Sequence, residues 1–325
     1  MSSAALIYRS TRQAHVRGLR GSLERCQAQA AARVPANNNS TLAPNNHHHR
    51  DRSGLTAAPG THQDVPPELP PFGHSKPFRF TQPPNPSWKL GQKSRPSVTH
   101  DATEDMRKRW DMESTTPRDA YKLMTSAIVP RPIALVSTLS NEGIANLAPF
   151  SYFSMISHNP PMVSVSFSMS KRRPKDTRDN ILSTKQFTVN IISDSFVEAA
   201  NSTSVESPAS MDEWVIGGLT PEPSVFVKPS LVRESSIGME CELYSFQDIC
   251  APKSSQITTT VVFGLIKYIH VRESVLDASK QSVDPAKLRP VSRLGGARYG
   301  RLTEAFELER IDWNNLGDTY NGLLG

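Results

Sequence analysis

The sequence has few cysteines and no long apolar run, and each absence excludes classes of protein. Cys26, Cys241 and Cys250 are too few and too scattered for a disulfide framework or a zinc site, and they fit a reducing compartment. The longest apolar stretches, such as "VVFGLI" at 261–266, have the length of a strand. We therefore expect no membrane span.

Positive charge is scarce outside the N-terminal third. Residues 1–100 carry 13 Lys and Arg against 4 Asp and Glu, whereas residues 101–325 carry 24 against 27. The net charge of +6 therefore comes from the first hundred residues, and the remainder is mildly acidic. Because nucleic-acid binding needs a basic surface, we expect no nucleic-acid partner for the C-terminal part.

Several common site motifs are also missing. The sequence contains no G-x-G-x-x-G, no G-x-x-x-x-G-K-[ST], no H-E-x-x-H and no G-x-S-x-G. These absences argue against Rossmann dinucleotide-binding domains, P-loop enzymes, zinc hydrolases of that type and α/β-hydrolases. The two histidines of the strand-rich region, His158 and His270, are interpreted as turn or sheet residues and not as catalytic bases.

The N-terminal third has the composition of an unfolded segment. Residues 1–34 are rich in Arg, Ala and Ser with a single acid, which predicts a mitochondrial transit peptide; a basic extension with no targeting role, in a cytoplasmic protein, is the alternative. Residues 35–108 lack periodic apolar positions, and 12 of the 26 prolines fall within 35–100, so this segment is predicted to be a disordered linker. Its tract His47–His49 is interpreted as incidental, and no metal site is predicted.

Residues 109–315 are predicted to form one folded domain, followed by a tail over 316–325. Short helices are predicted over 117–128, over 175–186 with Asp176 or Thr177 as the N-cap, and over 194–204 with Asp194 as the N-cap. In "PMVSVSF" the apolar and hydroxyl residues alternate with a period of two, which is typical of a strand. Strand-like runs lie at 132–138, 144–156, 161–167, 187–193, 239–246, 258–271 and 304–311.

The turn residues "NEG" at 141–143 predict a hairpin between the first two of these runs. Six or seven antiparallel strands with a few short helices indicate a mainly β fold, a closed or partly closed barrel.

A cluster of cations precedes the helix predicted over 175–186. Free N–H groups and the positive end of the dipole at a helix N-terminus suit an anion, and Lys175 and Thr177 add a charge and a hydroxyl, so these two predict a phosphate site. A solvated charged face is the alternative, and residues 171–173 are expected to be loop or interface charges. Arg178 has no assigned role.

Polar and aromatic residues on the neighbouring strands strengthen the phosphate interpretation. Residues 131–138 bring one arginine and two hydroxyls, and residues 146–151 bring an amide, a phenyl ring and a further hydroxyl. Together they offer polar contacts and an aromatic surface for a flat heterocycle. A plain pair of strands explains these residues equally well.

The order of these segments has a known parallel. "VPRPIALVSTLSNEGIANLAPFSYFSMISHNPPMVSVSF", then "KDTRDNILSTKQFTVNI", then "VSRLGGARY" resembles the flavin reductase-like family of FMN-binding split barrels over roughly residues 115–312. The resemblance implies a six-stranded Greek-key split β-barrel, usually a homodimer, with FMN bound non-covalently near the dimer interface.

The resemblance also implies which positions contact the flavin. The strand residues would flank its ribityl chain and ring, the "KDT" segment would hold its phosphate, and the "RLGG..Y" segment with Arg293, Gly295 and Gly296 would close the site or the interface. The implied FMN-binding residues are Arg131, Ser137, Thr138, Asn146, Ala148, Phe150, Ser151, Lys175, Thr177, Asn180 and Tyr299.

The function implied is that of an NAD(P)H-dependent flavin reductase, in which the cofactor carries the chemistry and no side chain acts as a catalytic acid or base. The "GDH" tripeptide that some members place near the nicotinamide is absent. An FMN-binding electron carrier without nicotinamide turnover is the alternative, with oxidase chemistry on a related barrel a more distant one.

Overall fold

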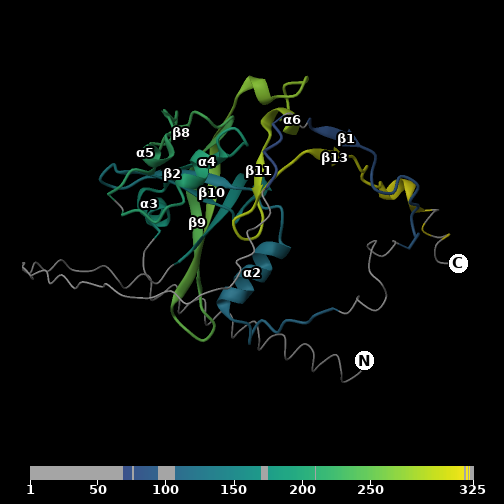
Figure 1. Cartoon of the computed structure of the whole chain (residues 1–325), viewed down its shortest axis with the longest axis horizontal. Coiled ribbons are helices and arrows are strands. Elements are labelled where there is room, and N and C mark those ends of the chain that lie inside the picture. Colours follow the sequence, from purple (N-terminus) through teal and green to yellow (C-terminus); the bar gives the residue numbers. More distant parts are fainter. Residues whose placement is uncertain are drawn as a thin grey trace, which may run out of the picture. The chain divides into compact units, whose positions relative to one another are not determined.

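The computed structural model describes residues 69–74, 77–93, 107–169, 175–208, 210–317, 320 and 322. The predicted transit peptide, most of the predicted linker and the cations at 171–173 lie outside these ranges. The chain divides into a unit of residues 1–76 and a unit of residues 77–325. All helices and strands of the described residues lie in the second unit (Figure 1).

The centre of this unit is an antiparallel sheet of seven strands in the order β3-β2-β6-β9-β10-β5-β4. Strands β2, β9 and β10 of this sheet are labelled in Figure 1. The sheet has one strand more than the six implied by the resemblance, and it confirms the mainly β prediction. Its strands are β2 Ala134–Leu139, β3 Ala145–Phe150, β4 Phe153–His158, β5 Pro161–Ser168, β6 Gln186–Ile191, β9 Ile237–Cys250 and β10 Ile257–Val271.

The connection between β3 and β4 shows that this sheet is rolled up. The single strand predicted over 144–156 is wrong, because it divides into β3 and β4, which form the two opposite edges of the sheet. Six strand spacings of about 4.8 Å would put these edges roughly 29 Å apart in a flat sheet. Only Ser151 and Tyr152 link them, a span of at most about 10 Å. The sheet must therefore curl until its two edges come close together, as in a partly closed barrel.

The interior of the sheet follows the alternation seen in the sequence. Val163, Val165 and Phe167 on β5 are buried, and Phe167 meets Phe150 of β3 edge to face at 4.7 Å between ring centroids. Burying each such side chain stabilises the fold by about 1.5–3 kcal/mol. The contact between these two rings also brings β3 and β5 together across the closure of the barrel.

The predicted hairpin is confirmed: β2 pairs with β3, and its turn contains Gly143 at a φ of +83°, a conformation that favours glycine. Outside the sheet lie pairs of short strands. The predicted strand over 304–311 is confirmed only for its first three residues, which pair in parallel with β1 away from the main sheet. These short strands are β1 Arg79–Thr81, β7 Pro221–Glu222, β8 Leu231–Val232, β11 Val291–Arg293, β12 Tyr299–Arg301 and β13 Glu304–Phe306.

Short helices cover parts of the sheet, and the prediction over 117–128 is confirmed. Thr116 caps it by accepting the Asp119 N–H at 3.2 Å. No helix of the described part is long and apolar enough to cross a membrane. The helices are α2 Pro117–Ala127, α3 Asp176–Thr184, α4 Val197–Ser202, α5 Glu213–Gly217, α6 Pro285–Leu288, η1 Glu273–Val275 and η2 Trp313–Asn315.

Two predicted helix caps are wrong. Lys175 occupies the N-cap of α3 and no side chain caps that helix, because the Thr177 hydroxyl is engaged by a strand residue instead. Phe196 occupies the N-cap of α4, since the carboxylate of Asp194 accepts hydrogen bonds from Arg289 and Arg301. In both cases a tertiary partner outcompetes the local backbone for the polar side chain.

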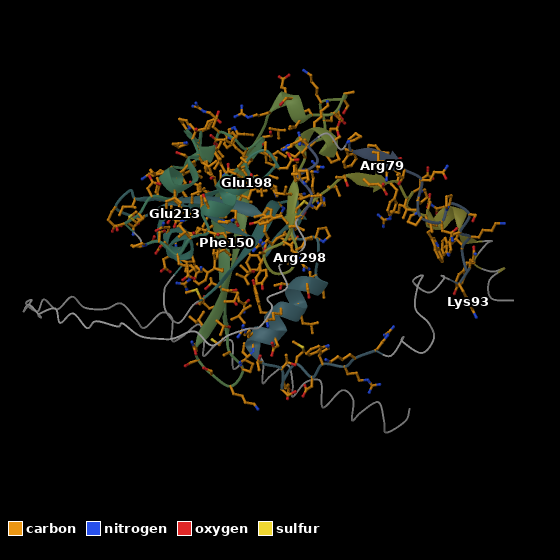
Figure 2. The ribbon with its side chains drawn as sticks, viewed as in Figure 1. Arg79, Lys93, Phe150, Glu198, Glu213 and Arg298 are labelled. Carbon is orange, nitrogen blue, oxygen red and sulfur yellow. The ribbon has the colours of Figure 1, made fainter. Side chains whose placement is uncertain are left out.

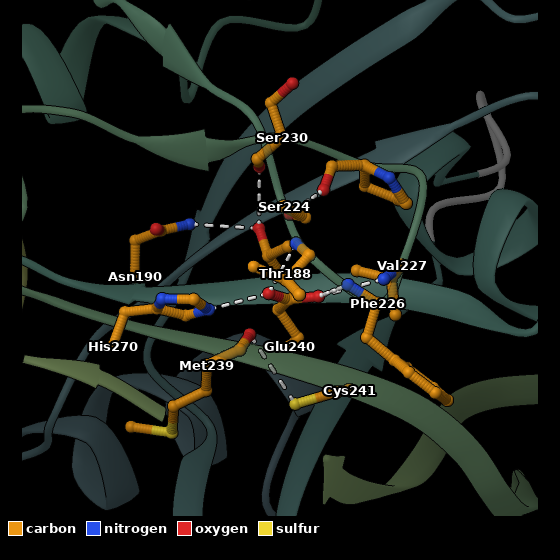
Figure 3. A network of polar contacts seen from close by, with 12 residues as sticks. Thr188, Asn190, Ser224, Phe226, Val227, Ser230, Met239, Glu240, Cys241 and His270 are labelled. Atoms are coloured by element: carbon orange, nitrogen blue, oxygen red, sulfur yellow. Dashed lines mark hydrogen bonds and ion pairs between the residues drawn. The ribbon is translucent and has the colours of Figure 1, made fainter. Parts of the chain in front are cut away.

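A buried carboxylate ties a surface turn to β9 (Figure 3). Glu240 is fully buried and accepts the backbone N–H groups of Val225, Phe226 and Val227 at 2.9, 2.6 and 2.9 Å. Nε2 of His270, on the neighbouring β10, lies 2.6 Å from the same carboxylate. His270 is thus a sheet residue, as the sequence indicated.

Candidate functional site

A pocket of about 320 Å³ opens where β3, β5, the start of α3 and the loop before α5 meet. Seven of the eleven predicted FMN-binding residues line it, although they come from three separate segments of the chain. These seven are Arg131, Asn146, Ala148, Phe150, Ser151, Lys175 and Thr177. The volume lies at the lower end of the roughly 300–1,000 Å³ usual for ligand pockets.

The start of α3 forms one wall. Lys175, Asp176 and Thr177 line the pocket, and no side chain caps the first turn of this nine-residue helix. Asn146 of β3 donates from Nδ2 to the Thr177 hydroxyl at 2.8 Å, with both side chains buried. This bond fixes the helix start against the edge strand, so the amides and the lysine face a defined space.

Strand β5 supplies hydroxyls that sequence reasoning did not assign to the site. Ser166 and Ser168 line the pocket from the face opposite to the buried Val165 and Phe167. The period-two alternation of "PMVSVSF" contains this signal, because it places all its serines on one face. What the alternation cannot show is that this face borders a pocket.

Arg131 lines the pocket, but most of its donors are already used. Nη1 donates to the carbonyls of Thr125 at 2.5 Å and Ile128 at 2.7 Å, Nη2 donates to Leu294 at 3.0 Å, and Nε lies 3.5 Å from the Ser151 hydroxyl. The guanidinium therefore joins the end of α2 to the 294 loop. Its positive charge remains beside the pocket, while only one N–H is left for a ligand.

Aromatic side chains form another part of the lining. Phe150, on β3, is held by its contact with Phe167, and Tyr121 and Tyr152 stand at the same pocket. Burial raises the pKa of Tyr152 and the nearby Tyr121 raises it further, whereas Arg131 lowers it. The net shift is upward, so the Tyr152 hydroxyl stays protonated at neutral pH and can donate a hydrogen bond.

The "RLGG..Y" segment contributes a cation and a close backbone approach. Arg293 and Gly296 line the pocket, and the guanidinium of Arg293 lies 4.5 Å from the Tyr299 ring centroid. A Cβ on Gly295 would come within 3.0 Å of the Ser126 side chain. Tyr299 is not part of the pocket lining. Its hydroxyl donates to Asn201 at 2.7 Å, which fixes the ring that the Arg293 guanidinium contacts.

Three further predicted residues lie outside the pocket lining. Ser137 and Thr138 are buried within β2, and Asn180 of α3 donates to the Thr138 hydroxyl at 3.1 Å. These contacts join α3 to the sheet. Arg178, which had no assigned role, donates to the Thr260 hydroxyl at 3.1 Å and pairs with Asp248 at 3.4 Å, so it anchors the same helix to β9 and β10.

Sequence reasoning also missed a buried carboxylate in the wall, labelled with Phe150 in Figure 2. Glu213, the first residue of α5, is 5% exposed and lines the pocket with the loop residues 203–207. Its carboxylate accepts the Leu147 N–H at 3.3 Å and the Ser207 hydroxyl. No motif marks this residue, and only the fold brings α5 to the edge of β3.

Comparisons with known proteins agree with this geometry. Residues 124–284 match the family model described as a flavin reductase like domain. An uncharacterized protein of Aquifex aeolicus is 39% identical over 180 residues, which cover 55% of this chain and 88% of that protein. The chain belongs to the flavin reductase-like family.

Solved structures give the same assignment. The crystal structure of nitrilotriacetate monooxygenase component B from Bacillus cereus superimposes with a TM-score of 0.60 at 33% identity, covering 63% of this chain and 100% of that one. A Shewanella frigidimarina protein with a split barrel domain has a TM-score of 0.53 at 22% identity, covering 64% and 100%. That second likeness concerns the fold alone. The described domain is thus a flavin reductase-like split barrel.

The donor set of the pocket fits a flavin of this family. A phosphorylated flavin needs an anion site, acceptors and donors along its polyol chain, and an apolar surface for its ring. The uncapped start of α3 with Lys175, the hydroxyls of β5 and the ring of Phe150 offer these three kinds of contact within one cavity. No cluster of metal ligands occurs in the described part of the chain.

Proposed function

We propose that this protein binds FMN in the pocket and acts as an NAD(P)H-dependent flavin reductase. The strongest support is that one cavity is lined by two different surfaces. The first is the uncapped start of α3 with Lys175 and Thr177, and the second is the wall formed by β3 and β5. An anion at the first and an aromatic ring beside the second would match the two ends of a single mononucleotide.

When bound, the flavin supplies the redox chemistry, accepting a hydride from a reduced nicotinamide and passing two electrons onward. The protein's residues bind and orient it. Lys175 and the α3 amides would hold the phosphate, Ser166 and Ser168 would contact the polyol chain, and the Tyr152 hydroxyl would donate toward the ring, where a donor favours negative charge. No side chain is required as a general acid or base. A monooxygenase component among the similar proteins supports a role in supplying electrons.

The test is optical. The purified protein, or the protein reconstituted with FMN, is made anaerobic and mixed with NADH or NADPH. Bleaching of the flavin absorbance supports the reductase, and comparing the two nucleotides identifies the preferred reductant. A yellow protein that does not bleach with either nucleotide indicates the alternative, an FMN-binding electron carrier. A protein that takes up no FMN would overturn both.

We also propose that the protein is a homodimer with this pocket near the interface. Large apolar side chains are exposed on the edge strand β4 and on α2, and the pocket is lined by Tyr121 of α2 and by Tyr152, which directly precedes β4. Met155, on β4, is 70% exposed. An exposed edge strand of this kind favours association. Sedimentation should give a dimer, and Met155→Asp should shift it to monomer; a monomeric wild type would contradict the proposal.

For localisation, we propose that residues 1–34 direct the protein to mitochondria, on the strength of their arginine-rich and acid-poor composition. A reporter fused behind these residues should accumulate in mitochondria. A variant with the arginines replaced by glutamine serves as the control and should stay diffuse. A diffuse signal from the unaltered segment would favour the cytoplasmic alternative.

A further inference from the structure

Glu213 is a buried carboxylate with a single donor on each of its two oxygens. It lies at the free edge of β3, where alternate N–H groups have no strand partner, and it accepts the Leu147 N–H at 3.3 Å. The Ser207 hydroxyl is its second donor. Among the described residues no cation forms an ion pair with it.

A carboxylate can accept about four hydrogen bonds, and Glu213 uses two of these positions. Burying a charge without full hydrogen bonding is costly, so such groups are normally satisfied by protein, water or ligand. Glu213 also lines the pocket, so its unused acceptor positions are next to the space that a ligand would fill. An acceptor-only group at this place selects for a ligand that brings a donor.

We propose that Glu213 accepts a hydrogen bond from an O–H or N–H group of the bound flavin and so helps to determine which ligand the pocket takes. This inference rests on the proposed function. It assigns to Glu213 a binding role in addition to its bond with the edge strand.

Two groups of a flavin can supply the donor: a hydroxyl of the polyol chain, or the single N–H of the ring. Leu147, which Glu213 contacts, follows Asn146, and Asn146 is bonded to Thr177 at the proposed phosphate end. The polyol chain adjoins the phosphate, so this placement favours a hydroxyl as the donor. A carboxylate would repel the phosphate itself, which instead belongs with Lys175.

The test combines a protein variant with ligands that lack one donor each. Glu213→Gln keeps the size of the side chain, and its amide can still bond both Leu147 and Ser207 while losing the charge. Glu234→Gln is the matched control, because Glu234 also accepts a backbone N–H, that of Thr220 at 3.1 Å, but lies outside the pocket lining. Affinities of the full chain are measured by fluorescence titration for riboflavin, lumiflavin and 3-methyl-lumiflavin, with FMN as the reference ligand.

If a polyol hydroxyl is the donor, Glu213→Gln should weaken riboflavin binding about tenfold and leave lumiflavin, which lacks the chain, unchanged. If the ring N–H is the donor, the affinity for lumiflavin should fall about tenfold, whereas the affinity for 3-methyl-lumiflavin should not change. Either pattern supports the proposal, and Glu234→Gln should show neither. Equal effects on all three ligands, or none, would overturn it.

The proposed function can be judged separately. A wild type that binds no flavin would overturn both proposals. If the wild type binds FMN and Glu213→Gln changes none of the flavin affinities, only the proposal for Glu213 is overturned. Should the glutamine variant fail to fold, Glu213→Asp retracts the carboxylate by one methylene and is expected to give the same ligand-dependent pattern. Thermal unfolding of each variant identifies such a failure.

Discussion

Two glutamates are buried in the described part of the chain: Glu240 lies in the scaffold of the barrel, and Glu213 lies at its pocket. Glu240 is fully buried and receives four donors, three backbone N–H groups and His270. Glu213 is almost as buried but receives two donors and faces a cavity. Burial alone therefore does not distinguish a structural carboxylate from a binding one, whereas the number of acceptor positions still unused does.

The largest effect is expected when the saturated carboxylate is removed. Glu240→Ala leaves three backbone N–H groups without their acceptor, so the free energy of unfolding should fall by about 3–5 kcal/mol. Urea denaturation measures this, and flavin affinity of the folded fraction should be unchanged. Glu242→Ala, which breaks a partly exposed pair with Lys267, is the control and should cost less than about 1 kcal/mol. Equal losses in the two variants would contradict the scaffold role.

In the pocket, the corresponding change should affect binding and not folding. Lys175→Ala removes the point charge at the α3 start, so FMN binding should weaken roughly 10–100-fold while riboflavin, which lacks the phosphate, is little affected. Isothermal titration with both ligands measures the difference. Lys228→Ala, an exposed lysine away from the pocket lining, is the control. Unchanged FMN affinity would refute the placement of the phosphate.

A smaller effect is expected from the fourth donor to Glu240. His270→Ala removes one hydrogen bond, but the three backbone donors remain and the imidazole is partly exposed, so the free energy of unfolding should fall by about 0.5–1.5 kcal/mol. The same urea experiment applies. A loss as large as that of Glu240→Ala would mean that the imidazole, and not the turn, is the main partner.

The smallest effect is a pH dependence. Burial raises the pKa of Glu240, but the N–H groups of Val225, Val227 and Phe226 and the His270 side chain lower it by more, so the net pKa lies below its ordinary 4.5. The stabilisation of the fold by the ionised Glu240 is therefore complete above pH 4.5, and it is lost as the pH falls through the lower pKa that Glu240 has in the folded protein. Thermal melts below pH 4.5 should show a shallower decline for Glu240→Gln than for wild type; parallel declines would contradict this.

Much of the fold could be predicted from local pattern. The alternation in β5, the "NEG" turn and the helix over 117–128 follow from period, glycine conformation and capping, which depend on neighbours in the chain. Errors arose where distant residues compete for a side chain. Asp194 pairs with two arginines and Thr177 bonds Asn146, so neither caps its helix.

The residues of the candidate site could likewise be predicted only in part from the sequence. The order of polar segments indicated the start of α3 and strand β3, and seven of the predicted residues do line one pocket. Ser137, Thr138 and Asn180 have the same residue types but lie in the packing between α3 and the sheet. Residue type cannot separate these cases, because which face of a strand borders a cavity depends on what packs against the other face.

Most of the strands, the hairpin and the chemical character of the α3 start could be predicted from the sequence, since these depend on propensity and spacing over a few residues. That β3 and β4 form opposite edges of a rolled sheet, and that Phe150, Lys175 and Glu213 reach one cavity, follows from the folded chain and not from any local pattern. Closure joins residues far apart in the chain, and its energy comes from packing that no local pattern records.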